Sequence, residues 1–124
     1  MLNKIIYKEL SYKIMGAAME VHNELGTGFL EKVYENSLVL SLKNKGLKVK
    51  QQYPIKVKFS GKVVGDYIAD VLVEDKLILE LKILKNISNI HKAQAFNYLK
   101  ATGLKLAIII NFKKERLETE RVVL

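Results

Sequence analysis

Apolar residues recur every three or four positions in the first third of the chain, which is the spacing of amphipathic helices. One stripe consists of Leu10, Ile14, Ala18, Val21 and Leu25, and a second consists of Leu30, Val33, Tyr34, Leu38 and Leu42. The first stripe predicts a helix over about residues 6–25, with Gly26 as its C-terminal cap. The second predicts a helix over about residues 29–45, which Gly46 ends.

The pattern then changes to an alternation of apolar and polar positions, which is typical of strands with one buried face. Residues 47–53 alternate until Pro54, and residues 55–59 alternate again, so we expect one strand on each side of the proline. Two further strands are expected over residues 63–73 and 77–83, with a short polar turn between them.

The last third of the chain adds one helix and one or two strands. A helix is expected over about residues 90–102, with Ser88 or Asn89 as its N-cap. The nearly continuous apolar run over residues 104–111 indicates a strand at the centre of a sheet that is covered on both faces. Residues 116–124 are interpreted as an edge strand or tail. The order ααββββαβ(β) predicts an α/β fold with a mixed central sheet and helices packed against it.

Composition narrows the class of protein. The chain has 124 residues, which suits one domain over residues 1–124, and it has no cysteine. Disulfide frameworks, thiolate metal sites and cysteine nucleophiles are therefore excluded. The longest apolar run, residues 106–110, is far shorter than the ~20 residues that cross a membrane. Residues 1–9 lack the features of a secretory signal, so we expect a cytoplasmic protein with no membrane partner.

Net charge gives the first indication of a partner. The chain has 21 Lys and Arg against 13 Asp and Glu, a formal net charge of +8. A small domain this basic attracts polyanions and binds phosphate backbones by releasing counterions. Composition equally allows a lysine-rich surface that only keeps the protein in solution, because it does not show whether the charges cluster.

Charged residues interrupt two apolar strands. Asp70 lies in the segment YIADVLV, and Glu80 and Lys82 lie in the segment LILELKI. A buried carboxylate is strongly unfavourable unless a partner or a metal ion compensates its charge. Glu80 and Lys82 are two residues apart, so they share one face of their strand. Alternatively, all three residues lie on a solvated face of the sheet and make ordinary cross-strand pairs.

The length of the turn between these two strands decides whether the carboxylates meet. A two-residue loop would pair Asp70 with Leu81 and place the carboxylates on opposite sides of the sheet. A three-residue loop would place Asp70 directly opposite Glu80, with their Cβ atoms about 4.5–5.5 Å apart. At that separation both carboxylates could bind one Mg²⁺ ion. The sequence leaves both loops open.

The segment GFLEKVY, residues 28–34, opens the second expected helix. Glu31 and Tyr34 are one turn apart and share a helix face, and the helix dipole favours a carboxylate in the first turn. With Gly28 as N-cap, Glu31 could instead reach back to the backbone as half of a capping box. Tyr34 is equally consistent with a core position.

Gln94 and Tyr98 are four residues apart on the third expected helix and share a face. Such a pair can donate hydrogen bonds to a phosphate, and the alternative is a polar rim with a half-buried tyrosine. The two histidines, His22 and His91, do not have the spacing of metal ligands. We interpret His22 as a helix-surface residue, and His91 as a residue that could approach the site from the start of the third helix.

These stretches together, in this order, resemble a known family. Residues 28–34 match the signature of the GxxExxY protein family. Asp70, followed ten residues later by ELK at residues 80–82, resembles the core motif of the PD-(D/E)XK nuclease superfamily, to which that family is assigned. Gln94 with Tyr98 resembles the accessory Q-x-x-x-Y motif on the helix that follows the core strands.

The resemblance extends over about residues 10–112, nearly the whole chain. It implies a restriction-endonuclease-like αβββαβ core with a mixed central sheet and an extra N-terminal helix. One departure is that Ala69 precedes Asp70 at the position where the name of the motif has proline.

The resemblance also implies a role for each site residue. Asp70 and Glu80 would bind Mg²⁺ or Mn²⁺, with the carbonyl oxygen of Leu81 as a further ligand. Glu31 would reach the metal ion or its water, and Lys82 would orient the attacking water or stabilise charge on the phosphorane. The supporting or nucleic-acid-contacting residues would be Tyr34, Gln94 and Tyr98.

The leading hypothesis is a Mg²⁺-dependent nuclease that hydrolyses phosphodiester bonds of DNA or RNA. The alternative is a non-catalytic module that keeps the fold and binds nucleic acid or a protein, so that its basic surface matters more than its carboxylates. A third hypothesis is a defence-associated hydrolase with a different substrate. Pairing of two copies through residues 116–124 into a homodimer is a further hypothesis.

Overall fold

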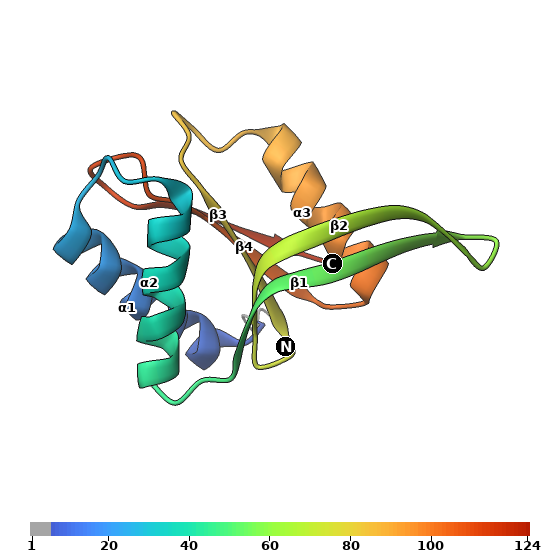
Figure 1. The fold of residues 1–124 in the computed structure, drawn as a ribbon, viewed down its shortest axis with the longest axis horizontal. Coiled ribbons are helices and arrows are strands. Elements are labelled where there is room, and N and C mark those ends of the chain that lie inside the picture. The colour runs from blue at the N-terminus through green and yellow to red at the C-terminus, as the bar shows by residue number, and fades with distance from the viewer. Residues whose placement is uncertain (1–5) are drawn as a thin grey trace.

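Helices and strands follow one another in the order ααβββαββ (Figure 1). A computed structural model describes residues 6–124, and residues 1–5, which belong to the segment interpreted above as lacking a secretory signal, lie outside it. The helices are α1 (Lys8–Leu25), α2 (Glu31–Asn44) and α3 (Asn89–Thr102). The strands are β1 (Val49–Phe59), β2 (Lys62–Val73), β3 (Leu77–Lys82), β4 (Leu106–Asn111) and β5 (Glu118–Val123). No helix within residues 6–124 has the length and apolar character needed to cross a membrane.

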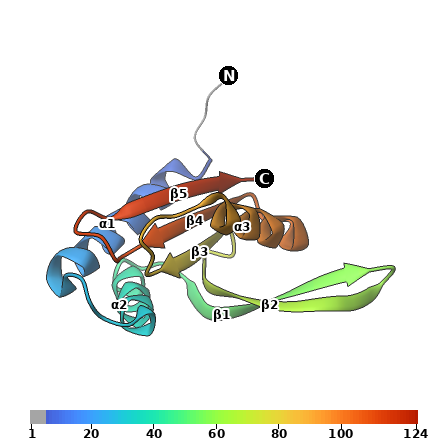
Figure 2. The same ribbon diagram turned by 90° about the horizontal axis from the view of Figure 1, so that it is seen from above.

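The strands form one mixed sheet in the order β1-β2-β3-β4-β5. β3 and β4 are parallel, with α3 as the crossover between them, and the other neighbouring strands are antiparallel. α1 and α2 cover one face of the sheet, and α3 covers the other (Figure 2). Every residue of β4 is buried, which confirms the central strand predicted from its apolar run. The predicted class, a mixed sheet flanked by helices, is confirmed.

The strand break expected at Pro54 was wrong, because β1 continues through the proline as one strand. Three strands rather than four therefore precede α3. β1 lies at the edge of the sheet and pairs only with β2. An edge strand leaves part of its backbone N–H groups without a strand partner, so proline, which has no N–H, is tolerated there.

β1 and β2 continue beyond the rest of the sheet as an antiparallel arm (Figures 1 and 2). β2 pairs with β3 only over three residues, Val71–Val73, and its earlier part pairs with β1 alone. We call residues 54–68 the arm. The arm leaves the sheet beside Asp70, so the residues that could form a site lie where the sheet divides.

The N-cap expected for α3 is confirmed at Ser88, and Gly103 forms its C-cap. His91 takes part in this cap, because its Nδ1 accepts a 3.0 Å hydrogen bond from the backbone N–H of Ser88. The imidazole considered as one that could approach the site is therefore engaged at the start of the helix.

His22 is buried, contrary to the prediction that it lies on the helix surface. Its Nε2 lies 2.8 Å from the carbonyl oxygen of Lys114, and its ring centroid lies 6.0 Å from that of Phe112. Both partners belong to the segment between β4 and β5. Helical periodicity contains no information on a partner so distant in sequence, which is why the burial was missed.

Candidate active site

The turn between β2 and β3 has three residues, and this turn sets the register of the two acidic strands. Glu74 and Asp75 adopt left-handed backbone conformations, with φ of 54° and 55°. Val73 pairs with Leu77, and the same register brings Asp70 opposite Glu80. Of the two loops that the sequence left open, the structure therefore contains the one that brings the acidic residues together.

Beyond the paired residues of β2 and β3, carboxylates replace the usual backbone ladder. The backbone N–H of Asp70 donates a 2.9 Å hydrogen bond to Oε2 of Glu80. The backbone N–H of Leu81 donates a 2.7 Å hydrogen bond to Oδ2 of Asp70. Both carboxylates thus lie in the gap between the strands, which we call the fork. Glu80 is only 5% exposed, so the alternative of a fully solvated acidic face was wrong.

Burial disfavours the ionised form of both carboxylates, and the charge of Asp70 adds to this effect at Glu80. Burial, and then the charge of Asp70, raise the pKa of Glu80 to about 8, although the backbone hydrogen bond and Lys82 oppose the shift. Burial also raises the pKa of Asp70, against the opposing hydrogen bond from Leu81. A cation placed between the two groups would relieve both effects.

β3 supplies two further groups directly after Glu80, the side chain of Lys82 and the carbonyl of Leu81. Lys82 lies on the same face of the strand as Glu80, and its charge lowers the pKa of both fork carboxylates. The carbonyl oxygen of Lys82 accepts a 3.0 Å hydrogen bond from Phe112, on the β4 side. Successive carbonyl groups of a strand point in opposite directions. The Leu81 carbonyl therefore faces the fork, as the Leu81 N–H does.

Glu31 is the first residue of α2, which begins after Leu30 as N-cap. The capping role considered for Glu31 was wrong, because it required Gly28 as N-cap and Glu31 two positions further into the helix. Burial, and then the charge of Asp70, raise the pKa of the Glu31 carboxyl, while Lys82 lowers it. Glu31 therefore lies within electrostatic reach of the fork, approaching from the α2 side of the sheet.

Tyr34 is fully buried and fastens the loop that precedes Glu31. Its hydroxyl donates a 2.6 Å hydrogen bond to the carbonyl of Gly26 and accepts a 3.4 Å bond from the N–H of Phe29. Its ring stacks on Phe112 at a centroid distance of 4.7 Å. Gly28, with φ of 107°, has a conformation that other residues rarely adopt. The glycine and the tyrosine of the GFLEKVY segment thus shape the loop that positions Glu31.

Glu35 is a buried site residue that the sequence reasoning missed, and it is 2% exposed. Its carboxylate accepts hydrogen bonds from the side-chain amides of Gln51 and Gln52, and forms a 3.1 Å ion pair with Lys32. Its charge raises the pKa of Asp70. A signal was present, because Glu35 is one helical turn after Glu31 and shares its helix face.

Gln52 makes β1 irregular opposite the residue of β2 at which the sheet divides. It has a left-handed backbone, with φ of 53°, and it is omitted from a ladder in which Gln51 pairs with Val71 and Tyr53 pairs with Ala69. The position opposite Gln52 in this register is Asp70. Asp70 of β2 therefore lies opposite the irregularity in β1 and also takes part in both carboxylate hydrogen bonds with β3.

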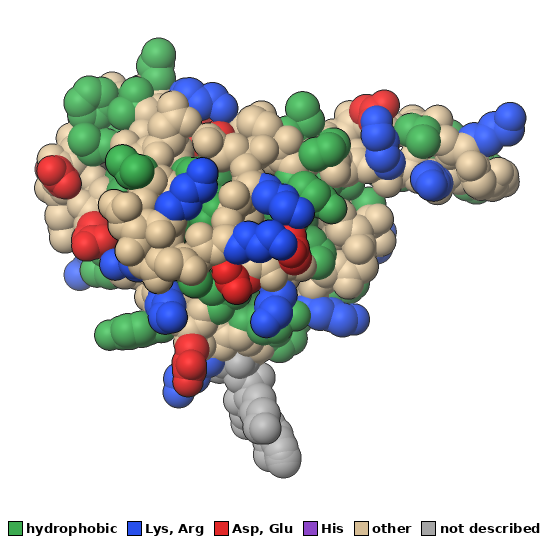
Figure 3. Space-filling model, turned by 60° about the horizontal axis from the view of Figure 1, so that its bottom comes forward, with side chains coloured by type: hydrophobic (Ala, Val, Ile, Leu, Met, Phe, Trp, Pro, Cys, Tyr) green, Lys and Arg blue, Asp and Glu red, His purple; other side chains and the backbone are tan. Residues whose placement is uncertain are grey.

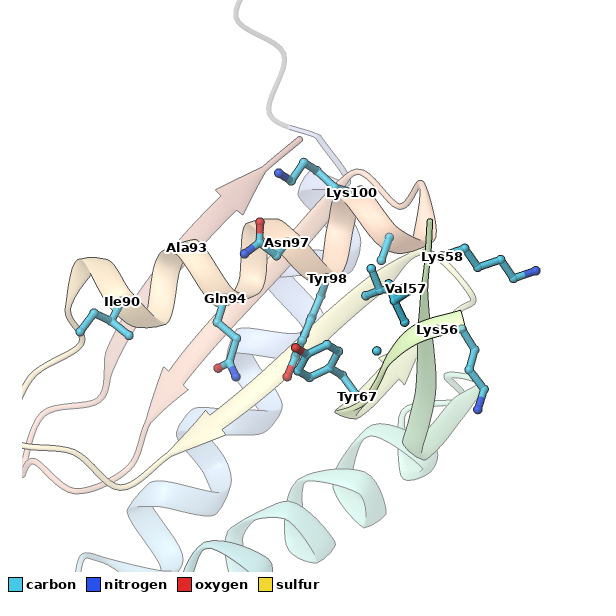
Figure 4. A pocket seen from close by; sticks show the side chains of 13 residues that line it. Lys56, Val57, Lys58, Tyr67, Ile90, Ala93, Gln94, Asn97, Tyr98 and Lys100 are labelled. Atoms are coloured by element: carbon cyan, nitrogen blue, oxygen red, sulfur yellow. The ribbon is translucent and has the colours of Figure 1, made fainter. Parts of the chain in front are cut away.

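α3 presents Tyr98 and Gln94 toward the same region. Tyr98 is largely buried, and burial, followed by the charges of Glu80 and Asp70, raises the pKa of its hydroxyl. Gln94 is exposed and lines a groove together with Tyr98 (Figure 4). Tyr98 thus lies within electrostatic reach of the fork carboxylates, and Gln94 lies beside it in the groove.

The donor set suits a hard divalent cation. Residues 6–124 contain no group of three or more His, Asp or Glu residues arranged to hold a metal ion. Mg²⁺ does not require such a group, because it is commonly bound by one or two carboxylates and keeps several waters. The carboxylates of Asp70 and Glu80, with the Leu81 carbonyl facing the same gap, are oxygen donors of this kind.

The excess positive charge does not form one continuous patch on the face drawn in Figure 3. Basic and acidic side chains are interspersed there, and basic side chains also mark the arm. Lys48 and Lys50, for example, both form ion pairs with Asp75, at 2.7 and 3.1 Å. The net positive charge of the chain therefore does not by itself identify a binding surface on this face.

Comparison with known proteins identifies the family. A family model described as the PD-(D/E)XK nuclease superfamily matches residues 8–122. The chain belongs to the PD-(D/E)XK nuclease superfamily. Membership of the GxxExxY family within it stays a prediction. No curated protein sequence matches this PD-(D/E)XK chain significantly.

Two solved structures share the fold of this PD-(D/E)XK chain. The crystal structure of SSO0001 superposes with a TM-score of 0.55 at 19% identity, over 94% of this chain and 57% of that protein. An alkaline exonuclease (LHK-Exo) from Laribacter hongkongensis superposes with a TM-score of 0.55 at 13% identity, over 98% of this chain and 72% of that protein. At these identities the likeness concerns the fold alone, and the chain spans little more than half the length of SSO0001.

Proposed function

We propose that this chain is a divalent-metal-dependent nuclease that hydrolyses phosphodiester bonds at the fork. The observation that supports this most strongly is the pair of carboxylates of half-buried Asp70 and buried Glu80, each bonded to the backbone of the other's strand. Two acids held together with raised pKa values are unfavourable without a cation. Membership of a nuclease superfamily makes hydrolysis the most direct use of such a site.

Asp70, Glu80 and the Leu81 carbonyl would hold Mg²⁺ or Mn²⁺, with Glu31 reaching the ion or one of its waters. Bound there, the ion would neutralise charge on the phosphate and lower the pKa of a bound water. The anchoring backbone bonds fix one oxygen of each acid, so the other oxygen of each is left to face a ligand.

Lys82 would orient the attacking water or stabilise negative charge that develops on the phosphate. Its position on the same strand face as Glu80 supports this role. Tyr98 and Gln94 would contact the nucleic-acid backbone beside the fork, and Tyr34 would act only by holding the loop before Glu31. Pairing of two copies through the β5 edge stays a prediction.

A nuclease panel tests the proposal. Wild-type protein should cleave at least one of single-stranded DNA, duplex DNA, single-stranded RNA and duplex RNA with Mg²⁺ or Mn²⁺, and should cleave none in EDTA. Glu80→Ala and Lys82→Met should each reduce the rate by about 100-fold or more. Lys13→Met, an exposed position on α1, should leave it unchanged.

Circular dichroism establishes that each variant is folded before its rate is compared. Wild-type protein that leaves every substrate intact at all metal concentrations would contradict the proposal and favour a binding module. Unchanged cleavage by folded Glu80→Ala and Lys82→Met would also contradict it, because hydrolysis would then come from another site or from a contaminant.

A further inference from the structure

A groove of about 1130 Å³ separates α3 from the arm (Figure 4). It lies on the α3 side of the sheet, and its wall includes Tyr98, which lies within electrostatic reach of the fork carboxylates. The arm contributes the opposite wall through residues of β1 and β2, among them Val57 and Tyr67. The groove is therefore an open surface that leads to the candidate site.

The wall of the groove combines aromatic and apolar surface with lysines. Tyr67 is 49% exposed, and its ring centroid is 5.8 Å from that of Tyr98. A Cβ atom at Gly65 would lie 3.1 Å from Cε2 of Tyr67, so the glycine leaves room for the tyrosine ring along the strand. Ile90 adds an 80% exposed apolar side chain from the start of α3. Such exposed rings and apolar groups can contact flat nucleobases.

Charge in the groove has one sign. Its described lining residues include three lysines, Lys56, Lys58 and Lys100, and no Asp or Glu. Lys56 is paired with Asp66 on the neighbouring strand, which leaves Lys58 and Lys100 as the principal cations. In Figure 4 these lysines extend outward from the rim, whereas Tyr67 and Tyr98 point toward one another and Gln94 extends from α3 beside them.

We propose that this groove receives a single nucleic-acid strand, with bases against Tyr67 and phosphates at Lys58 and Lys100, and directs it to the fork. The inference rests on the proposed function, for which it names the class of substrate. A single strand exposes base faces to an apolar wall and phosphates to a basic rim. In a duplex the base faces are already stacked, so the aromatic wall would have nothing to contact.

Fluorescence anisotropy in EDTA separates binding from cleavage. The probes are fluorescein-labelled single strands of fifteen thymidines and fifteen uridines, and a fifteen-base-pair DNA duplex. Wild-type protein should bind at least one single strand more tightly than the duplex. A preference for the DNA or the RNA strand would identify the sugar that the groove accepts, and either preference supports the proposal.

Tyr67→Ala should weaken single-strand binding by roughly 5- to 100-fold, which is the effect of removing one base-stacking ring. Tyr67→Phe keeps the ring and should bind like wild type. Tyr12→Ala, which removes an exposed tyrosine from α1 on the other side of the sheet, should have no effect. Lys58→Glu should reduce affinity and the salt dependence, whereas Lys13→Glu on α1 should change them much less.

Two results would overturn the proposal that the groove binds a single strand. One is duplex binding as tight as single-strand binding, and the other is folded Tyr67→Ala and Lys58→Glu proteins that bind like their α1 controls. Metal-dependent cleavage together with either result would reject single-strand binding in the groove but support the proposed nuclease activity. Single-strand binding that depends on Tyr67, without cleavage of any substrate, would support strand binding in the groove and reject the proposed nuclease activity.

Discussion

The carboxylates of Asp70 and Glu80 are each anchored by the strand that carries the other. Oε2 of Glu80 accepts a 2.9 Å hydrogen bond from the N–H of Asp70, and Oδ2 of Asp70 accepts a 2.7 Å bond from the N–H of Leu81. The two side chains therefore occupy the place of a backbone ladder, and the strands separate around them. This exchange holds two acids together inside the protein before any ligand arrives, which is preorganisation for a cation.

The free energy of unfolding of the metal-free protein should fall as pH rises, and Glu80→Gln is expected to remove most of this fall. The pKa of Glu80 is raised from 4.5 to about 8, so the folded protein binds this proton more tightly than the unfolded chain does. The stabilisation is complete below about pH 4.5 and is lost as pH rises through about 8, at up to about 1.4 kcal/mol per pH unit. Chemical denaturation in EDTA from about pH 5 to 8.5 measures it.

Over that pH range the free energy of unfolding of the wild type should fall more steeply than that of Glu80→Gln. The free energy of unfolding of the variant should still fall slightly with pH, because the pKa values of Asp70 and Glu31 are also raised. Glu24→Gln, at an exposed position of α1, should follow the wild type. Parallel curves for the wild type and Glu80→Gln would show that Glu80 does not titrate as a buried group.

Much of the sheet could be predicted from hydrophobic periodicity, because each strand has to bury a face. The pairing of Asp70 with Glu80 could not, since it depends on whether the turn has two or three residues. That choice is made by Glu74 and Asp75, which adopt left-handed conformations without glycine or asparagine. Asp75 indicates a turn but not how many residues it contains, so the sequence left the register open.

The rest of the site depends on contacts between residues distant in sequence. Glu35 shares a helix face with Glu31, but its burial follows only from the fold, in which Gln51 and Gln52 donate to it from β1. His22 became a core residue because the segment after β4 covers it. Positions such as Glu31 and Lys82 were accessible from motif spacing, whereas these two required the packed fold.

Tyr34→Phe is expected to loosen the loop before Glu31 while it keeps the stack on Phe112. The variant loses the hydroxyl that donates to Gly26 and accepts from Phe29. Since a hydrogen bond typically contributes about 1 kcal/mol, the free energy of unfolding should fall by about that amount. Hydrogen exchange should show faster exchange at the Phe29 amide.

Tyr12→Phe is the control for this variant, because Tyr12 is 82% exposed and its loss should leave stability unchanged. A Tyr34→Phe protein with wild-type stability and wild-type exchange at Phe29 would show that the hydroxyl does not hold the loop. Nuclease activity should fall together with the loosened loop, since Glu31 is placed by it.

Glu35→Ala is expected to destabilise the fold by about 0.5–1.5 kcal/mol, because the side-chain amides of Gln51 and Gln52 and the ammonium of Lys32 lose their shared buried acceptor. Glu35→Gln keeps an acceptor oxygen and should lose less. Denaturant unfolding measures both, with Glu24→Ala as the exposed control. Equal stability of the wild type and Glu35→Ala would mean that Gln51 and Gln52 find other partners at no cost.

Titration with Mn²⁺, followed by the electron paramagnetic resonance signal of the free ion, tests most directly whether Asp70 and Glu80 share one cation. The wild type should bind one ion at this site. Asp70→Asn and Glu80→Gln, which preserve shape and each remove one charge, should both lose it, while Asp66→Asn on the arm should keep it. Wild-type protein that binds no Mn²⁺, or an Asp70→Asn/Glu80→Gln double variant that binds it as well as the wild type does, would contradict the account.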